Sequence, residues 1–292
     1  MTAFRSPVSR GRGRILLSAL LLVASAAAFG QKIVYPRPVA DFDKRSEYPL
    51  LLLRLALSKT ENHYEPVPGE NIMNKARVAV ELAEGRLDVA WMVTNTERET
   101  ALRPIRICVF KGLGGWRVAL VTKENENLLA GVDSISSLCA YIAGQQFDWP
   151  DTAILQRNGI PVTTTASYDV LFKMLIAGRF DWFPRNIMEI WDEEKAWSSQ
   201  GILVEPHLLV KYPSAYYFFV RRDNEALAHA IETGLEAALA DGSLDALFLE
   251  CHGDVFAKAR VKNRRVIELA NPYLPPLTPV DRKDLWYEPL PQ

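Results

Sequence analysis

Two arginines in this sequence stand where an arginine side chain could bind an anion. Arg98 ends the polar stretch 94–98, and Arg185 follows the apolar stretch 180–183. A guanidinium group donates a fork of N–H groups that matches a carboxylate or a phosphate. The alternative for each arginine is a surface salt bridge, which contributes little to stability. We treat both as candidate anion-binding residues.

Aromatic and polar side chains near the expected strand ends extend this candidate site. Trp91 and Trp149 could stack on a ligand, although aromatic residues more often belong to a core. Asp148 has two interpretations, because it could hold a ligand amine or cap the helix that follows it. The complete set of candidate ligand-binding residues is Tyr35, Arg37, Trp91, Thr94, Arg98, Asp148, Trp149, Phe183, Arg185 and Asn186.

Asp88 and Asp181 could suggest a catalytic carboxylate pair. Each stands three residues after a glycine, in the same local pattern. We therefore expect each to begin a strand and to accept hydrogen bonds from nearby backbone. The four histidines lack metal-binding spacing, and no nucleophile elbow, phosphate loop or metalloprotease motif is present. The sequence predicts no catalytic residue, no metal and no cofactor.

The shared pattern reads Gly-Arg-apolar-Asp and occurs at residues 85–88 and 178–181. In each copy an amphipathic helix is expected to end at the glycine, which readily adopts the left-handed conformation that stops a helix. An apolar strand follows, and we expect the second, Phe180–Phe183, to end at Pro184. Because ligands of α/β sheets bind beyond the carboxyl ends of strands, both units predict one shared site.

The order of the elements predicts an α/β chain with two lobes. Residues 31–115 form the first part of lobe 1, residues 116–211 form an inserted lobe 2, and residues 212–292 return to lobe 1 and end in a tail. Three glycines just before residue 116 predict a flexible joint. The tail from Asn271 carries six prolines and is expected to run as extended segments over the surface.

Local signals predict where individual elements begin and end. We expect Asn71 to cap one helix, Asp223 to cap a long helix, and Leu244–Glu250 to form the next helix. Thr94–Arg98 is expected as a loop, and Ile105–Phe110 as a strand.

Residues 1–30 have the pattern of an export signal. Four arginines and no acidic residue occur there, and a short apolar run leads to small residues that permit cleavage before Phe29 or Gln31. An uncleaved membrane anchor is the alternative. Without these residues the formal net charge falls from -1 to -5, which does not suggest a nucleic-acid partner. The three cysteines lie far apart, so one disulfide or three buried thiols are both compatible with export, and we expect buried thiols.

An export signal, an interrupted lobe, the Gly-Arg-Leu-Asp strand unit and the Thr-x-Thr-Glu-Arg loop together resemble the bacterial periplasmic solute-binding proteins of family 3, over about residues 32–253. The resemblance implies the type 2 periplasmic-binding-protein fold, with a helix-flanked sheet in each lobe, a two-strand hinge and a ligand between the lobes. It also assigns Arg98 to a ligand carboxylate. Residues 183–186 lack the carboxylate that commonly holds the ligand amine, so the chain resembles a divergent member.

The resemblance implies a non-enzymatic, monomeric periplasmic protein that binds a small polar or anionic solute, such as an amino acid or an organic acid, for ABC-type uptake. Its partner would be an ABC permease. One alternative is a ligand-sensing module for a membrane partner. Another is a dehydratase-like enzyme on the same fold, which would need a general acid in the cleft, with Asp148 and Glu97 as candidates.

Overall fold

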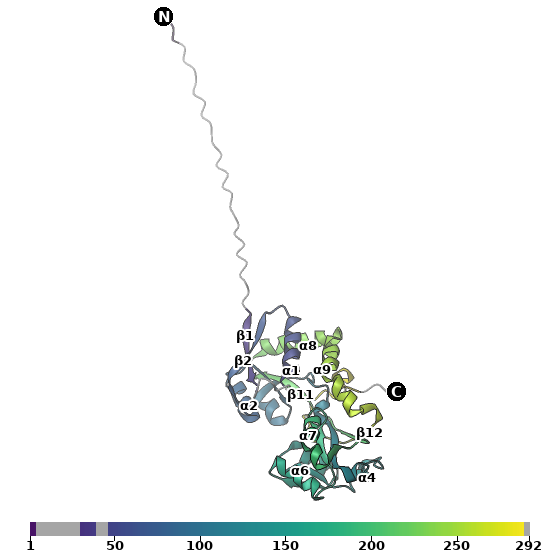
Figure 1. Ribbon diagram of the computed structural model, residues 1–292. Coiled ribbons are helices and arrows are strands. Elements are labelled where there is room, and N and C mark those ends of the chain that lie inside the picture. The colour runs from purple at the N-terminus through teal and green to yellow at the C-terminus, as the bar shows by residue number, and fades with distance from the viewer. Residues whose placement is uncertain (4–29, 39–45, 289–292) are drawn as a thin grey trace.

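The computed structural model describes residues 1–3, 30–38 and 46–288. Most of the expected export signal therefore lies outside the described residues. Within them, no helix has the length and apolar character needed to cross a membrane. The elements form an upper and a lower group in Figure 1, which we call the first and the second lobe.

The first lobe is built on an antiparallel sheet with the strand order β3-β11-β4, and the parallel pair β1 and β2 contacts it through β1. Helix α8 packs on α1 so closely that a Cβ atom on Gly234 would lie 1.9 Å from the carbonyl oxygen of Ala56. The elements of this lobe are β1 (Gln31–Arg37), α1 (Glu47–Ser58), β2 (Tyr64–Ile72), α2 (Lys75–Ala83), β3 (Val89–Val93), α3 (Thr96–Ala101), β4 (Leu102–Ile105), β11 (Tyr216–Arg221), α8 (Glu225–Ala240) and α9 (Ser243–Ala259).

The second lobe contains a mixed sheet with the order β12-β10-β5-β8, in which β9 also pairs with β5. A second, parallel pair joins β6 to β7, and the chain between them forms α5. The elements of this lobe are β5 (Trp116–Thr122), α4 (Ile135–Leu138), β6 (Ala143–Gln146), α5 (Pro150–Arg157), β7 (Val162–Thr165), α6 (Tyr168–Ile176), β8 (Phe183–Asn186), α7 (Ile190–Trp197), β9 (Ile202–Val204), β10 (Leu208–Lys211) and β12 (Arg265–Glu268). Short 3-10 turns occur at Leu113–Gly115, Lys123–Asn125, Ser198–Gln200, Val261–Asn263 and Lys283–Leu285.

The two Gly-Arg-apolar-Asp units adopt the same backbone arrangement. Gly85 and Gly178 have φ angles of 74° and 63°, in the left-handed region that favours glycine. The carboxylate of Asp88 accepts a hydrogen bond from the Val34 N–H at 2.7 Å, and that of Asp181 accepts one from the Ile142 N–H at 2.6 Å. The expectation that both aspartates serve the backbone is confirmed.

Strand β8 differs from the expectation, because it begins at Phe183 and continues through Pro184. Pro184 is paired in register with Ala119 of β5, and its carbonyl oxygen accepts a hydrogen bond from the Gln145 side chain at 3.3 Å. Proline lacks an N–H group, so it is tolerated in a strand wherever the ladder does not need that donor. Phe180, the expected start of the strand, is instead a buried core residue.

Several expected boundaries are also wrong. Asn71 still belongs to β2, so it does not cap the next helix. Helix α2 begins after Asn74, whose side chain accepts a hydrogen bond from the Arg77 N–H at 2.9 Å. Asn224, and not Asp223, caps α8 through the Leu227 N–H. The region 94–98 enters a short helix, the strand expected at 105–110 ends at Ile105, and α9 extends to Ala259.

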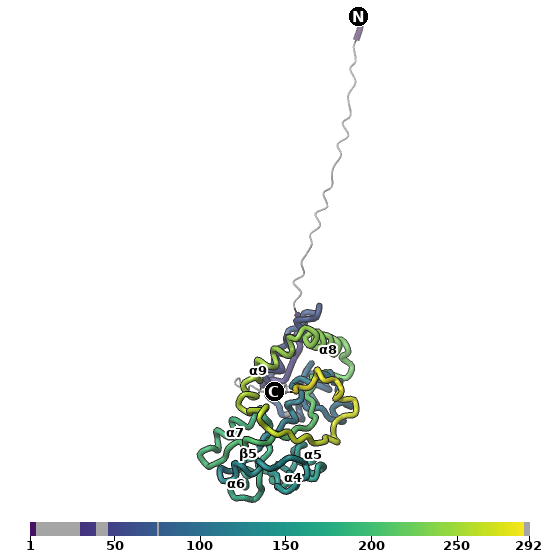
Figure 2. Tube along the Cα trace, turned by 90° about the vertical axis from the view of Figure 1, so that its right-hand side faces the viewer, coloured from purple at the N-terminus to yellow at the C-terminus, as the bar shows by residue number. Residues whose placement is uncertain are grey.

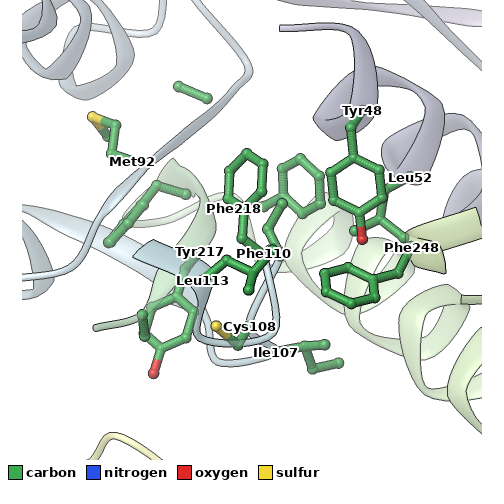
Figure 3. Close-up of a cluster of buried hydrophobic side chains, with 14 of the residues drawn as sticks. Tyr48, Leu52, Met92, Ile107, Cys108, Phe110, Leu113, Tyr217, Phe218 and Phe248 are labelled. Atoms are coloured by element: carbon green, nitrogen blue, oxygen red, sulfur yellow. The ribbon is translucent and has the colours of Figure 1, made fainter. Parts of the chain in front are cut away.

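A cluster of aromatic side chains fills the first lobe (Figure 3). The Tyr48 ring lies 5.5 Å from Phe110 and 4.6 Å from His252, measured between centroids. Burial lowers the pKa of His252, whose Nδ1 is 3.0 Å from the carbonyl oxygen of Phe248. The cysteines are free thiols, but only Cys108 is buried, whereas Cys139 is half-buried and Cys251 is exposed, so the expectation of three buried thiols is wrong.

The glycine joint is tightly packed. Leu113, Gly114 and Gly115 are all buried, and a Cβ atom on Gly115 would lie 1.8 Å from the carbonyl oxygen of Tyr212, on the chain segment that returns to the first lobe. The Tyr212 N–H also donates to the Gly115 carbonyl oxygen at 3.1 Å. The glycines are thus needed for a close approach of two connecting segments, and the flexibility expected of this joint stays a prediction.

The C-terminal segment is mostly exposed or half-buried from Asn271 on, as the sequence predicted for a surface tail, and it contacts both lobes. It lies along the middle of the molecule as the yellow tube of Figure 2. Strand β12 pairs in parallel with β10, although the sequence assigns residues 212–292 to the first lobe and its tail. Further on, the Tyr287 N–H donates to the Lys111 carbonyl oxygen at 2.8 Å, and the Lys211 ammonium donates to the Glu288 carboxylate at 2.9 Å. The segment therefore contacts both connecting segments.

Candidate functional site

Helix α3 follows β3 directly and carries Arg98 at the carboxyl end of that strand. The Asn95 side chain caps α3 by accepting a hydrogen bond from the Arg98 N–H at 2.7 Å. The Arg98 guanidinium is half-buried and donates through Nη1 to the Val93 carbonyl oxygen at 2.7 Å. Among the described residues no carboxylate forms an ion pair with it. Its remaining N–H groups can therefore bind an anion.

The neighbouring candidates of the first lobe have different surroundings. Thr94 is buried, and its hydroxyl donates to the Glu99 carboxylate at 2.6 Å. Trp91 is half-buried, and its ring centroid lies 5.9 Å from that of the buried Tyr35. Arg37 is exposed and donates through Nε to the Gly69 carbonyl oxygen at 2.7 Å. Tyr35 and Thr94 thus support the site from within the lobe.

Arg185 of β8 forms a bidentate ion pair with Glu193 of α7. Its Nε lies 2.7 Å from Oε2 and its Nη2 lies 2.6 Å from Oε1, while Glu189 is a weaker partner at 3.5 Å. Only 11% of the Arg185 side chain and 10% of the Glu193 side chain are exposed. Burial by itself would lower the pKa of Arg185, but the hydrogen bonds and charge of Glu193 raise it above its usual value. The expected free anion-binding fork is therefore occupied by a carboxylate of the protein.

Three aromatic rings surround the Arg185 guanidinium. Its Cζ atom lies 4.6 Å from the centroid of Trp149, 5.1 Å from that of Phe183 and 5.5 Å from that of Tyr168. The Trp149 and Phe183 rings are nearly parallel, with 9° between their planes. The Tyr168 hydroxyl donates to Glu193 at 2.7 Å, and burial together with this carboxylate raises the pKa of Tyr168. We call Arg185, Glu193 and the three rings the aromatic cage.

Asp148 and Asn186 differ in how far their side chains are engaged. Asp148 is exposed, and because α5 is capped by the backbone of Trp149 with no side-chain bond, the capping interpretation of Asp148 is wrong. Asn186 donates to the Leu113 carbonyl oxygen at 2.9 Å and accepts from the Met188 N–H at 2.9 Å. Its amide therefore fastens β8 to the connecting segment, and only Asp148 keeps an unused polar group.

Tyr216, at the start of β11, is influenced by charged side chains of both lobes. Its pKa is raised by burial and then by the carboxylate of Glu189, whereas the guanidinium groups of Arg117 and Arg98 lower it. Its ring also packs against Gly114, with ring carbons 3.1 Å from the place of a Cβ atom. Tyr216 thus packs on the connecting segment at Gly114 and is within reach of charges from both lobes.

Four residues of this arrangement are not among those predicted from the sequence: Tyr168, Glu189, Glu193 and Tyr216. Tyr168 begins the helix after β7, and Glu189 and Glu193 follow β8, so the rule that sites form beyond carboxyl ends of strands could have included them. The described residues contain no cluster of three or more potential metal ligands. Among the described residues, the first lobe thus provides a guanidinium without a carboxylate partner at Arg98, and the second lobe provides stacked aromatic rings around an arginine neutralised by Glu193.

Comparison by sequence gives no match to a family model or to a curated protein. Solved structures do match the fold. One is the probable amino-acid ABC transporter extracellular-binding protein ytmK from Bacillus subtilis, with a TM-score of 0.57 and 17% identity, over 77% of this chain and 99% of that chain. Another is YCKB from Bacillus subtilis, with a TM-score of 0.52 and 18% identity, over 81% and 96%.

A third similar structure is a histidine kinase sensor domain with similarity to periplasmic binding proteins. Its TM-score is 0.50 at 13% identity, over 77% of this chain and 97% of that chain. At such identities the likeness shows the fold alone. The chain therefore has the two-lobed α/β fold of the type 2 periplasmic binding proteins, as the sequence predicted.

Proposed function

We propose that this chain is an exported, non-enzymatic binding protein for a small solute that carries a carboxylate, such as an amino acid or an organic acid. The ligand would lie between the lobes, as a divergent member of solute-binding family 3 would hold it. The observation that carries the proposal is Arg98, a half-buried guanidinium at the end of β3 without a carboxylate partner among the described residues. A hydrogen bond to a charged group is among the stronger ones in proteins.

Within this proposal the ligand has three kinds of partner. Arg98 binds the carboxylate, the half-buried faces of Trp91 and Trp149 contact the apolar part, and Asp148 is the acceptor available to an ammonium group. Tyr35 and Thr94 support the first-lobe wall, whereas Phe183, Arg185 and Asn186 support the second. Arg37 remains a candidate at the end of β1. The lobe limits 31–115, 116–211 and 212–292 stay a prediction, with β12 as an addition to the second lobe.

The setting we propose is the periplasm, with residues 1–30 as a cleaved signal, a monomeric mature chain and an ABC permease as partner. A sensing role for a membrane partner is the second candidate, because a histidine kinase sensor domain shares the fold. Mass spectrometry of a periplasmic extract tests the first point. We expect a mature chain that starts near Phe29 or Gln31, and a full-length product in the membrane would contradict it.

A thermal-shift screen tests the binding function directly. Amino acids, organic acids and neutral sugars would be added to the purified chain, because a ligand that binds only the folded protein raises its melting temperature. We expect stabilisation by carboxylates, lost in Arg98→Ala and kept in the control Arg179→Ala, which changes an exposed arginine outside the site. Stabilisation by neutral sugars alone, or equal stabilisation of both variants, would contradict the proposal.

A further inference from the structure

In the aromatic cage the carboxylate bound to Arg185 belongs to the protein itself, whereas in an anion-binding site it belongs to a ligand. Glu193 lies on α7, eight residues after Arg185 in the sequence, and it accepts from both the Nε and the Nη2 donors of Arg185. A ligand carboxylate would use the same fork of donors. Glu189, outside the cage, adds a second carboxylate 3.5 Å from Nη2 of Arg185, so a second ligand anion would meet two negative charges against one guanidinium.

The carboxylate of Glu193 is also held independently of Arg185. The Tyr168 hydroxyl donates to its Oε1 at 2.7 Å, and Tyr168 comes from the start of another helix, α6. Glu193 is about nine-tenths buried. An incoming anion would therefore have to displace a buried carboxylate from two partners before it reached Arg185.

We infer that Glu193 is a specificity-determining residue that keeps Arg185 occupied, so that the site accepts solutes with one carboxylate and an apolar part and rejects dicarboxylates. This inference rests on the proposed function, since it concerns the same site. Glu193 acts through Arg185 and is a positioning residue in this sense. Arg98 takes the carboxylate, and the half-buried Trp149 ring, stacked against Arg185, contacts the apolar part.

The experiment compares two pairs of probes by calorimetry: L-phenylalanine with L-glutamate, and 3-phenylpropanoate with glutarate. In the parent we expect the phenyl monocarboxylates to bind more tightly than the dicarboxylates. In Glu193→Gln, Arg185 becomes available, and the ratio of affinities should shift toward the dicarboxylates by about 10-fold or more, which is the effect of one charge-assisted hydrogen bond. The double variant Glu189→Gln/Glu193→Gln should shift it further.

Matched variants separate specificity from damage to the fold. Asp192→Asn removes the same charge from the same helix at an exposed position and should leave the ratio unchanged. Glu193→Asp keeps the charge and should restore much of the parental ratio. Tyr168→Phe removes only the hydroxyl that holds Glu193 and should give a shift in the same direction, but a smaller one.

The outcomes distinguish this inference from the proposed function. If the parent binds dicarboxylates at least as tightly as the phenyl monocarboxylates, the inference is wrong, even when Glu193→Gln does not fold. It is also wrong if the folded Glu193→Gln keeps the parental ratio. In both cases a carboxylate still binds, and the proposed function stands. If the parent binds no carboxylate probe and only neutral sugars, the proposed function itself fails.

Discussion

In the first lobe the carboxylate of Asp88 binds the Val34 N–H, and in the second lobe the carboxylate of Asp181 binds the Ile142 N–H. The backbone hydrogen bonds in the opposite direction match as well. The Asp88 N–H donates to the Val34 carbonyl oxygen and the Asp181 N–H donates to the Ile142 carbonyl oxygen, both at 2.8 Å. The arginines beyond the two strands are unlike. Arg98 binds a backbone carbonyl, whereas Arg185 is neutralised by Glu193. The two lobes thus share a scaffold, and the side chains placed on it give them different electrostatic roles.

The largest expected effect is on the stability of the second lobe. Arg185→Ala removes one partner of a buried ion pair and leaves Glu193 without it, which typically costs about 3–5 kcal/mol. Arg98→Ala should leave stability nearly unchanged, because Arg98 has no carboxylate partner among the described residues. Urea denaturation of both variants measures the difference. Equal losses would show that the two arginines have the same role.

The second prediction concerns affinity for the ligand. Here the larger effect is expected for Arg98, whereas for stability it is expected for Arg185. Arg98→Ala should weaken the binding of a monocarboxylate by about 10- to 150-fold, which corresponds to about 1.5–3 kcal/mol for a hydrogen bond to a charged group. Arg98→Lys should keep part of the affinity, because lysine keeps the charge but lacks the fork of donors. Calorimetry with the carboxylate found in the screen is the measurement, and parental affinity in Arg98→Ala would remove Arg98 from the site.

The third prediction tests the shared scaffold. Asp88→Ala and Asp181→Ala each remove a carboxylate that accepts from a strand N–H, so each should lower the free energy of unfolding by about 1.5–3 kcal/mol. The two losses should be similar, since the geometry is the same in both lobes. Catalytic or ligand-binding roles for these aspartates would instead appear as a change in binding at unchanged stability.

A smaller effect is expected at the glycines that end the two helices. Gly85→Ala and Gly178→Ala place an alanine at a positive φ angle, which costs about 1–2 kcal/mol for an L-residue. Gly85→Ala should be the more costly variant, because its methyl group would lie 2.7 Å from Nη1 of Arg221, while Gly178 faces open space. Chemical denaturation checks the order, and a larger loss for Gly178→Ala would contradict it.

The smallest effects are expected at the arginines inside the units. Arg86 forms ion pairs with Glu81 and Glu84, so Arg86→Ala should lower the melting temperature slightly. Arg179 is exposed, and Arg179→Ala should change neither the melting temperature nor ligand affinity. A clear loss of binding in either variant would mean that the site extends to the helix ends.

The sequence predicts those features that depend on neighbouring residues. The roles of Asp88 and Asp181 follow from a four-residue pattern, and the two-lobed α/β organisation follows from two copies of it together with the order of the elements, while the type 2 binding-protein fold follows from the resemblance to family 3. The pairing of Arg185 could not be predicted in the same way, because Tyr168 comes from a different helix and joins Glu193 only in the folded chain. Strand β12 was missed for a related reason, since its partner β10 lies more than fifty residues earlier in the sequence.

The pairing of β12 with β10 has a consequence for the order of folding. The sheet of the second lobe has four of its five strands by residue 211, but its last strand is supplied only by residues 265–268. During synthesis the chain must therefore pass through the whole of β11, α8 and α9 before that sheet can close. A pairing between such distant segments forms late and slowly, because the intervening chain must first be brought together. The sheet of the second lobe should accordingly be completed only after nearly all of the chain has been made.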